Sequence, residues 1–404
     1  MKQQKLTVSE LLLLIPEKFF DLIAVKTNVD FQVKKLHGRL MFNLLLMGIL
    51  ESERLSLRVL EELFHTQKFQ FFAGLSVGVE TRHSSIRDRI TTIQSEYFEE
   101  LFYKIAGLLN RKFKRKDKGK YKVERFDSTV VSLSSKLMKI GMVSGNKNKK
   151  GEHSINQIKF TVGFNGLISH KVKVYTDQKY LSDDEPLFES ITENKFDKNS
   201  IAVFDRGLKT RTQFKALNDK HKLFVTRINP TKNYTIIKII TTEKTETDSL
   251  IIEKELLVYL KGTKANKLIK TPLRLIIAQH KENNEPIYFI TNIDDLTVEE
   301  ITEVYKMRWD IEVFFRFLKQ ELNLNHLLSR TLNGIMVILY MTLITAMLMM
   351  VHKQINNIQG YKIAKLRFIE ELDKELLKFI VIACNGNPEK LNNDNLNFMR
   401  FVQS

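Results

Sequence analysis

Apolar residues recur at helical spacing over the first part of the chain. The clearest runs are RLMFNLLLMGIL at 39–50 and LRVLEELF at 57–64, where apolar positions lie three or four residues apart. Thr7 and Glu10 have the spacing of a capping box, which favours a helix that begins just after Thr7. This part of the chain is therefore predicted to be all-helical.

The pattern changes to strands at Tyr121. Three β-prone runs come first, separated by Gly-, Asn- and Lys-rich turns: YKVERFDSTVVSL (121–133), QIKFTVGF (157–164) and ISHKVKVYT (168–176). Helical and strand segments then alternate: EPLFESITE (185–193), IAVFD (201–205), LKTRTQFKALND (208–219) and LFVTRI (223–228). Antiparallel strands followed by strands that alternate with helices predict a mixed α/β sheet rather than a sandwich.

Residues 230–296 return to β character without a helical period. Their runs are YTIIKIITTE, SLIIEKELLVYL, PLRLIIAQH and PIYFITNI, and we expect them to form an inserted antiparallel sheet. A helix then begins at Thr297, where Glu300 completes a capping box. This helix is predicted to run to about Asn323.

The segment Ile335–Val351 carries no charged residue. Its length lies at the lower limit for a membrane-spanning helix. However, it is the only such segment, and it follows a strongly amphipathic helix in a highly charged chain. We predict a core helix packed behind the sheet, with a membrane helix as the alternative.

The composition adds a strong positive charge. The chain has 64 Lys and Arg against 47 Asp and Glu, a net charge of +17. This excess indicates a polyanionic partner, nucleic acid first and an anionic membrane surface next, unless the protein is basic only for solubility. The run RKFKRKDKGK at 111–120 is expected to be a linker that can follow phosphates, or else a solvated basic segment. The single cysteine, Cys384, excludes an internal disulfide and fits a reducing cytoplasm.

Two aspartates stand where a folding role explains them poorly. Asp127 interrupts the β-prone run VERFDSTVV, and a carboxylate buried there costs free energy unless something compensates it. Asp205 ends the strand IAVFD, just before Arg206-Gly207, at the kind of strand end where α/β sheets place functional groups. Each one alone is more often a turn or helix cap. Together, at equivalent places in one sheet, they are candidate functional residues.

The helix from Thr297 presents a polar face. At about 100° per residue, Tyr305, Arg308, Glu312 and Lys319 fall within an arc of roughly 60° on a continuous helix. The alternative is a solvated surface ion pair between Arg308 and Glu312, worth a few tenths of a kcal/mol. Trp309 is expected to be a packing residue that supports this helix rather than one that stacks on a base.

Two further groups of charged residues have open interpretations. The segment SSIRDRITTI (84–93), with Arg87 and Arg89, could be the recognition helix of a helix-turn-helix or an ordinary surface helix. The acidic clusters 183–185 and 294–295 precede predicted helices, so helix capping is the favoured explanation for both.

These motifs together resemble one known family. The spacing Tyr, two residues, Arg, three residues, Glu, six residues, Lys is similar to the signature of bacterial insertion-sequence transposases with a DDE triad. FDST at 126–129 and FDRGL at 204–208 resemble the two aspartate strands of that family. FVTRI at 224–228 and the segment 289–309 also resemble family sequence. The resemblance covers residues 120–330, and the N-terminal region is similar only loosely.

The resemblance implies a function for each motif. Asp127, Asp205 and Glu312 would be catalytic and would bind two Mg²⁺ ions, with Mn²⁺ as a substitute. Arg308 and Lys319 would grip DNA phosphates, and Tyr305 would contact DNA beside the cleavage site, where a hairpin intermediate with a flipped base is expected. Arg316, Arg87 and Arg89 are the other candidate DNA-binding residues. Hard carboxylate oxygens without a His or Cys set agree with magnesium.

The implied fold is a ribonuclease H-like mixed sheet with an inserted β-rich subdomain, preceded by an all-α domain. The predicted segments are a DNA-binding domain (1–118), the first part of the core (119–229), the insertion (230–296), the second part (297–360) and a helical tail (361–404). The implied activity is cut-and-paste transposition of inverted-repeat ends by a cytoplasmic homodimer on double-stranded DNA, with no membrane partner. The alternatives are a metal-dependent nuclease and a domesticated DNA-binding protein.

Overall fold

The computed structural model describes residues 5–76, 78–113, 115, 119–133, 140–144, 155–194, 199–262 and 267–392. They form two compact units: a helical unit, Met1–Leu109 with Phe317–Ser404, and a sheet unit, Asn110–Arg316. This division groups the residues after Arg316 with the N-terminal helices, which differs from the segments predicted from the sequence. Residues 114 and 116–118 of the basic run, and the whole turn 145–154, lie outside the described residues.

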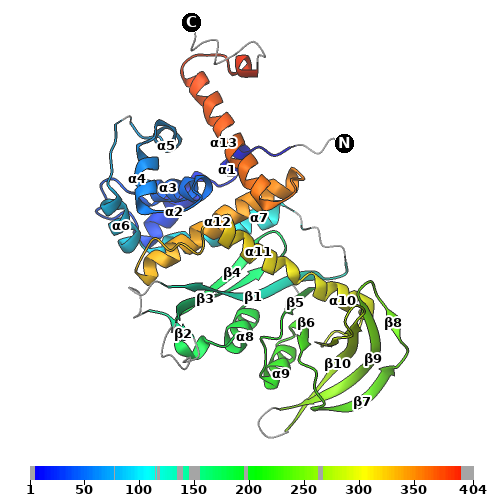
Figure 1. Ribbon diagram of the computed structural model, residues 1–404. Helices are drawn as coiled ribbons and strands as arrows, with labels where there is room; N and C mark the ends of the chain where they lie inside the picture. Colours follow the sequence, from blue (N-terminus) through cyan, green and yellow to red (C-terminus); the bar gives the residue numbers. More distant parts are fainter. Residues whose placement is uncertain are drawn as a thin grey trace. The chain divides into compact units, whose positions relative to one another are not determined.

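The described elements of the helical unit are all helices (Figure 1). The predicted capping box is confirmed, because Thr7 and Glu10 bond reciprocally at the start of the first helix. The helices of this unit are α1 (Val8–Leu13), α2 (Glu17–Thr27), α3 (Gly38–Glu51), α4 (Leu57–His65), α5 (Gln67–Phe72), α6 (His83–Thr92), α7 (Ser95–Lys112), α12 (Leu332–Ile355), α13 (Tyr361–Ala383) and the short 3-10 helix η3 (Pro388–Asn392).

Helix α12 is the centre of the helical unit. It packs against α1, α3, α6 and α13. Within the described part of the chain it is the one helix long and apolar enough to cross a membrane, yet 94% of its most apolar window is buried inside the protein. Its burial agrees with the predicted core helix. Its main neighbours are helices of the same unit, and its packing behind the sheet stays a prediction.

The sheet unit contains the other elements (Figure 1). Its strands are β1 (Lys122–Ser132), β2 (Met142–Ser144), β3 (Ile155–Phe164), β4 (Ser169–Tyr175), β5 (Ser200–Phe204), β6 (Leu223–Ile228), β7 (Tyr234–Thr241), β8 (Thr245–Glu246), β9 (Leu250–Lys261), β10 (Leu268–His280) and β11 (Pro286–Thr291). Its helices are η2 (Gln178–Tyr180), α8 (Asp184–Glu193), α9 (Arg211–Asp219), α10 (Val298–Lys306) and α11 (Trp309–Gln320), the last of which continues into the helical unit. The predicted mixed α/β class is confirmed.

All the strands belong to one sheet with the order β2-β3-β1-β5-β6-β11-β10-β9-β7; β4 pairs with β3 and β8 with β9. Strands β1, β5 and β6 are parallel, and β3 runs antiparallel to β1. Residues 230–296 are β-rich as predicted, but β11 pairs directly with β6. The inserted strands therefore extend the central sheet and do not form a separate one.

Each face of the sheet buries its own core. One core contains Phe126, Phe204 and Phe224 with residues of α8 and α9. The other contains Val123, Val203 and Val225 with residues of α10 and of the loop before it. Side chains alternate between the two faces along each strand, so every second residue of β1, β5 and β6 faces α10.

The inserted strands also fix the loop that precedes α10. Arg274 on β10 is buried and donates to the carbonyl oxygens of Ile293 and Leu296, at 2.8 Å each. Its guanidinium also pairs with the buried carboxylate of Glu255. These contacts fix the loop from which α10 begins. Thr297 caps that helix, and its predicted capping box with Glu300 is confirmed.

The predicted single helix from Thr297 to Asn323 is wrong. Helix α10 ends at Lys306 and α11 begins at Trp309. The amide of Arg308 bonds to the oxygen of Tyr305 at 2.9 Å, and that of Ile311 to the oxygen of Arg308 at 3.2 Å. These three-residue hydrogen bonds tighten the chain between the two helices. The helical-wheel argument, which assumed a continuous helix, therefore does not apply across Met307 and Arg308.

Candidate active site

Three charged residues occupy the same level of three neighbouring strands. In the parallel pairs, Phe126 lies beside Phe204, and Phe204 beside Thr226. One residue further along each strand are Asp127, Asp205 and Arg227. By alternation from Val123, Val203 and Val225, all three face α10. The sheet thus brings together the two aspartates that were predicted from separate sequence motifs.

The two carboxylates have opposite electrostatic environments. Burial raises the pKa of Asp127 to about 7, and the nearby Asp183 and Asp205 also raise it, against the opposing effects of the Ser128 amide and the Arg308 charge. Burial also acts on Asp205, but the backbone hydrogen bond of Arg206 and the charges of Arg308 and Arg227 outweigh it and lower the pKa. Asp205 therefore stays ionised where Asp127 readily takes up a proton.

Tyr305 lies over Asp205 between two arginines. Its hydroxyl donates to Oδ1 of Asp205 at 3.1 Å. The guanidinium carbons of Arg227 and Arg308 lie 5.2 and 5.7 Å from its ring centre, within the range of cation–π interaction. The buried Nε atoms of both arginines have no hydrogen-bond partner among the described residues. Each arginine thus keeps an unused donor beside the aspartates.

Arg308 also binds Glu312. Its guanidinium lies 2.6 Å from Oε1 of Glu312, and only 7% of Arg308 is exposed. The pair is therefore not the solvated surface pair that the sequence allowed. No group of three His, Cys, Asp or Glu side chains in the described ranges is placed to hold a metal ion. The structure places Asp127 beside Asp205 and pairs Glu312 with Arg308.

The other predicted DNA-binding residues lie elsewhere. Arg316 is exposed on α11. Lys319, in the helical unit, is half-buried, and burial lowers the pKa of its ammonium group. Arg87 is exposed on α6 and pairs with Asp88. Arg89 is largely buried and donates to the carbonyl oxygens of Leu36 and Val29, at 2.8 and 2.7 Å, so its observed contacts are structural.

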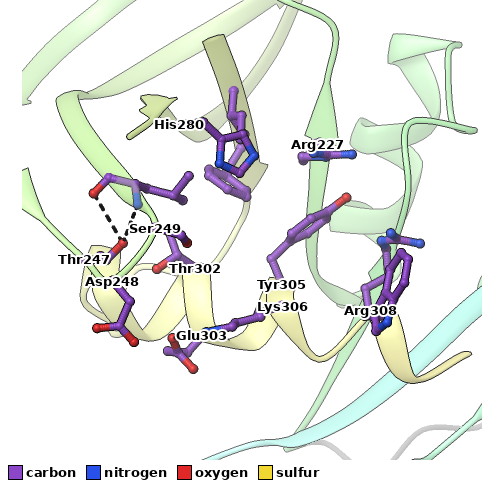
Figure 2. Close-up of a pocket in the computed structure, with 14 residues that line it drawn as sticks. Arg227, Thr247, Asp248, Ser249, His280, Thr302, Glu303, Tyr305, Lys306 and Arg308 are labelled. Atoms are coloured by element: carbon purple, nitrogen blue, oxygen red, sulfur yellow. Dashed lines mark hydrogen bonds and ion pairs between the residues drawn. The ribbon is translucent and has the colours of Figure 1, made fainter. Parts of the chain in front are cut away.

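A cavity of about 290 Å³ opens beside Tyr305. Figure 2 shows Tyr305, Arg227 and Arg308 on one side of it and the loop Thr247–Ser249 on the other. Trp309 also lines the cavity and is 53% exposed. The expectation that Trp309 is a packing residue is wrong, because its side chain is exposed. Trp309 is the first residue of α11, directly after the turn between α10 and α11.

The acidic clusters do not cap helices with their side chains as expected. Asp183 precedes α8 without a capping hydrogen bond and pairs with the buried Lys159 at 2.8 Å. Asp184 accepts hydrogen bonds from the amides of Lys209 and Thr210. Asp295 accepts a hydrogen bond from the Tyr121 hydroxyl at 2.7 Å. Each of these three carboxylates has a long-range partner that local sequence does not reveal.

Sequence reasoning missed Arg227 as a site residue. The signal was present, because FVTRI was recognised as a family-like block and Arg227 is its single charged residue. Its place at the site became visible only through the β5–β6 register, which sets it beside Asp205. The ion-pair distance between Arg227 and Asp205 is 3.5 Å.

Comparison with known proteins agrees with this arrangement. Residues 119–348 match the family described as transposase DDE domain. The chain belongs to this family. The match includes Asp127, Asp205 and the turn with Arg308 and Glu312, so the predicted relationship to insertion-sequence DDE transposases is confirmed.

Curated relatives of this transposase carry the same kind of name. A protein named as a transposase for insertion sequence element IS4SA, from Synechocystis sp., is 28% identical over 76% of this chain and 81% of its own. One named for insertion sequence element IS5377, from Geobacillus stearothermophilus, is 22% identical over 63% of this chain and 62% of its own. A solved piggyBac transposase synaptic complex with hairpin DNA has a TM-score of 0.49 and 8% identity, over 99% of this chain and 84% of that one.

The family membership establishes the class of enzyme. The chain is a DDE transposase, an enzyme that cleaves DNA. DDE transposases as a family use divalent metal ions.

Proposed function

We propose that this transposase binds the inverted-repeat ends of an insertion sequence and catalyses cut-and-paste cleavage and strand transfer. Asp127, Asp205 and Glu312 are its catalytic, metal-binding carboxylates. The observation that carries the proposal is the register that places Asp127 beside Asp205 on the α10 face. Arg308, whose charge acts on both aspartates, pairs with Glu312.

The donor set fits divalent metal. Three carboxylates offer the hard oxygen ligands that Mg²⁺ prefers. Asp127 is an acidic side chain whose charged form is disfavoured by burial and by neighbouring carboxylates. A cation beside it would reverse that effect. When bound, two Mg²⁺ ions, or Mn²⁺ in their place, would activate the attacking water or 3′-hydroxyl and stabilise the leaving oxygen.

Arg308 links DNA binding to the third carboxylate. It is paired with Glu312 in the protein alone, and its Nε has no partner among the described residues. A DNA phosphate would attract the guanidinium fork and so free Glu312 to complete the carboxylate set. Lys319 and Arg316 would bind further phosphates as α11 continues. Arg87 and α6 would contact the ends from the helical unit.

The cavity beside Tyr305 suits a nucleotide next to the cleavage site. It offers an aromatic surface, two guanidinium groups and the exposed ring of Trp309. Such surfaces bind extruded bases by stacking and grip the flanking phosphate by charge. A hairpin intermediate with a flipped base is the reaction species that would use it.

The fold, the partner and the assembly complete the proposal. The antiparallel strands β1, β3 and β4, followed by β5 and β6 parallel to β1, have the topology of a ribonuclease H-like core. The charge of +17 supports double-stranded DNA as partner. Assembly as a homodimer in the synaptic complex and a cytoplasmic location follow from the family resemblance. A metal-dependent nuclease with the same site is the second candidate.

Asparagine substitutions of the two aspartates test this function. Asp127→Asn and Asp205→Asn should each remove Mg²⁺-dependent nicking of end DNA and leave end affinity within about twofold, because neither removes a phosphate contact. The control is Asp219→Asn on α9, which loses only an exposed pair with Lys215. Nicking that survives in either site variant means that the assignment is wrong.

A further inference from the structure

A buried arginine lies on the catalytic strand two residues before Asp127. Arg125 shares the α10 face of β1 with Asp127 by alternation, and only 3% of it is exposed. A guanidinium in the middle of a sheet loses its hydration and is stable there only when its donors are bonded. The contacts of Arg125 therefore show which part of the structure this buried guanidinium stabilises.

The guanidinium spans the turn between α10 and α11. Its Nε donates to the carbonyl oxygen of Met307 at 3.0 Å. One terminal nitrogen donates to Oδ2 of Asp310 at 2.8 Å, and the other to the oxygen of Val123 on its own strand at 2.9 Å. One rigid planar group thus fixes the end of α10 and the first turn of α11 to β1.

The surrounding chain makes room for this contact. Gly166, in the turn between β3 and β4, has a positive φ of 93°. A Cβ atom there would lie 3.2 Å from a terminal nitrogen of Arg125. A side chain at position 166 would therefore crowd the guanidinium as well as strain the turn. Gly166 leaves Arg125 the space to reach the turn between the helices.

The two residues that Arg125 contacts are close in sequence to the site's own residues. Arg308 follows Met307 directly, and Glu312 is two residues after Asp310 on α11. We propose that Arg125 is a positioning residue: by tying the turn between α10 and α11 to β1, it fixes where Arg308 and Glu312 lie relative to Asp127. This inference rests on the proposed function, because it assumes that Glu312 completes the metal-binding set.

The alternative is that Arg125 contributes only to stability. Asp310→Asn separates the two, because it removes the charge of a half-exposed side chain and so weakens its ion pair with Arg125. The buried donors of Arg125 on Met307 and Val123 stay in place. Glu189→Gln on α8 is the matched control. Glu189 pairs with Lys173 in the same unit, on a helix that packs against the opposite face of the sheet.

The experiment uses the full-length protein and three measurements: the melting temperature without metal, Mn²⁺ affinity by calorimetry with pre-cleaved end DNA bound, and end affinity by gel shift. The bound DNA is needed because Arg308 otherwise holds Glu312. Asp310→Asn should weaken Mn²⁺ binding about tenfold or more, as loss of a residue that orients a metal ligand does. It should melt within a few degrees of the Glu189→Gln variant. Arg125→Lys, which keeps the charge but cannot span both partners, should weaken Mn²⁺ binding further.

Two outcomes overturn the inference. An unchanged Mn²⁺ affinity in Asp310→Asn would mean that the Arg125 guanidinium does not position Glu312. Equal loss of affinity in Glu189→Gln, at equal loss of melting temperature, would make the effect one of stability. Failure of the proposed function looks different, because wild-type protein would then bind no Mn²⁺ through Asp127 and would show the same affinity as Asp127→Asn.

Discussion

Arg308 is the residue on which the site's charges converge. It affects the pKa values of both aspartates, lies over Tyr305 and pairs with Glu312. A buried guanidinium with several anionic neighbours is well placed to change partners when a stronger anion arrives. The chemistry proposed here therefore depends on which anion Arg308 holds.

Substitutions on α10–α11 separate DNA contact from catalysis. Glu312→Gln should abolish cleavage with little loss of end binding, because it removes a metal ligand and no phosphate contact. Arg308→Ala should weaken end binding by about 1–3 kcal/mol and lower the salt slope by roughly one unit. End affinity measured against salt concentration checks both. An unchanged slope and affinity in Arg308→Ala would show that Arg308 does not meet DNA.

The pKa of Asp127 predicts a pH effect on the metal-free protein. The folded-state pKa is raised from 3.8 to about 7. Between these values the folded state binds more protons than the unfolded state, so the contribution of Asp127 to stability falls as pH rises through that window. Asp127→Asn, neutral at every pH, should melt higher than wild type at about pH 8, with a difference that shrinks towards pH 4. A difference that is the same at every pH would contradict this.

At the scale of elements, the turn between α10 and α11 is the feature that sequence could not predict. The segment YKMRWDIE contains neither Gly nor Pro, and its apolar spacing is that of one helix. The break coincides with contacts from Arg125, whose strand is far away in the sequence. The nearness of Asp127 and Asp205, in contrast, could be predicted, because each interrupts or ends a β-prone run, which is a local property.

The exposure of Trp309 was missed for the same reason. A lone tryptophan is usually packed, and a continuous helix would have placed it beside a buried face. The turn instead sets Trp309 at the edge of the cavity. Likewise, the long-range partners of Asp183, Asp184 and Asp295 could not be found by counting helix starts.

Helix α12 gives a prediction about the element that most resembles a membrane span. Its residues are almost wholly buried among other helices, so its apolar surface is already covered. Expressed protein should stay in the supernatant without detergent after a high-salt wash that removes bound nucleic acid. Retention in the membrane fraction after that wash would contradict the assignment of α12 as a core helix.

At the scale of the whole molecule, the sequence predicted the mixed α/β class and the family, whereas the grouping of segments depends on long-range contacts. Strand and helix patterns are local, so the mixed α/β class could be read from them. Which segments pack together is decided by long-range contacts. The helices after Arg316 join the N-terminal ones, and β11 joins the inserted strands to β6. Most of the net positive charge lies in the sheet unit, 110–316, and it indicates the partner rather than the fold.

The central claim is that Asp127, Asp205 and Glu312 act by binding metal, and a change of ligand softness tests it most directly. Asp205→Cys replaces a hard oxygen ligand by sulfur, which Mg²⁺ disfavours and Mn²⁺ tolerates better. End cleavage by this variant should be lost with Mg²⁺ and partly restored with Mn²⁺, while Asp219→Cys cleaves with both ions. Loss of cleavage with Mg²⁺ and no recovery with Mn²⁺, or full cleavage with Mg²⁺, would contradict metal binding by Asp205.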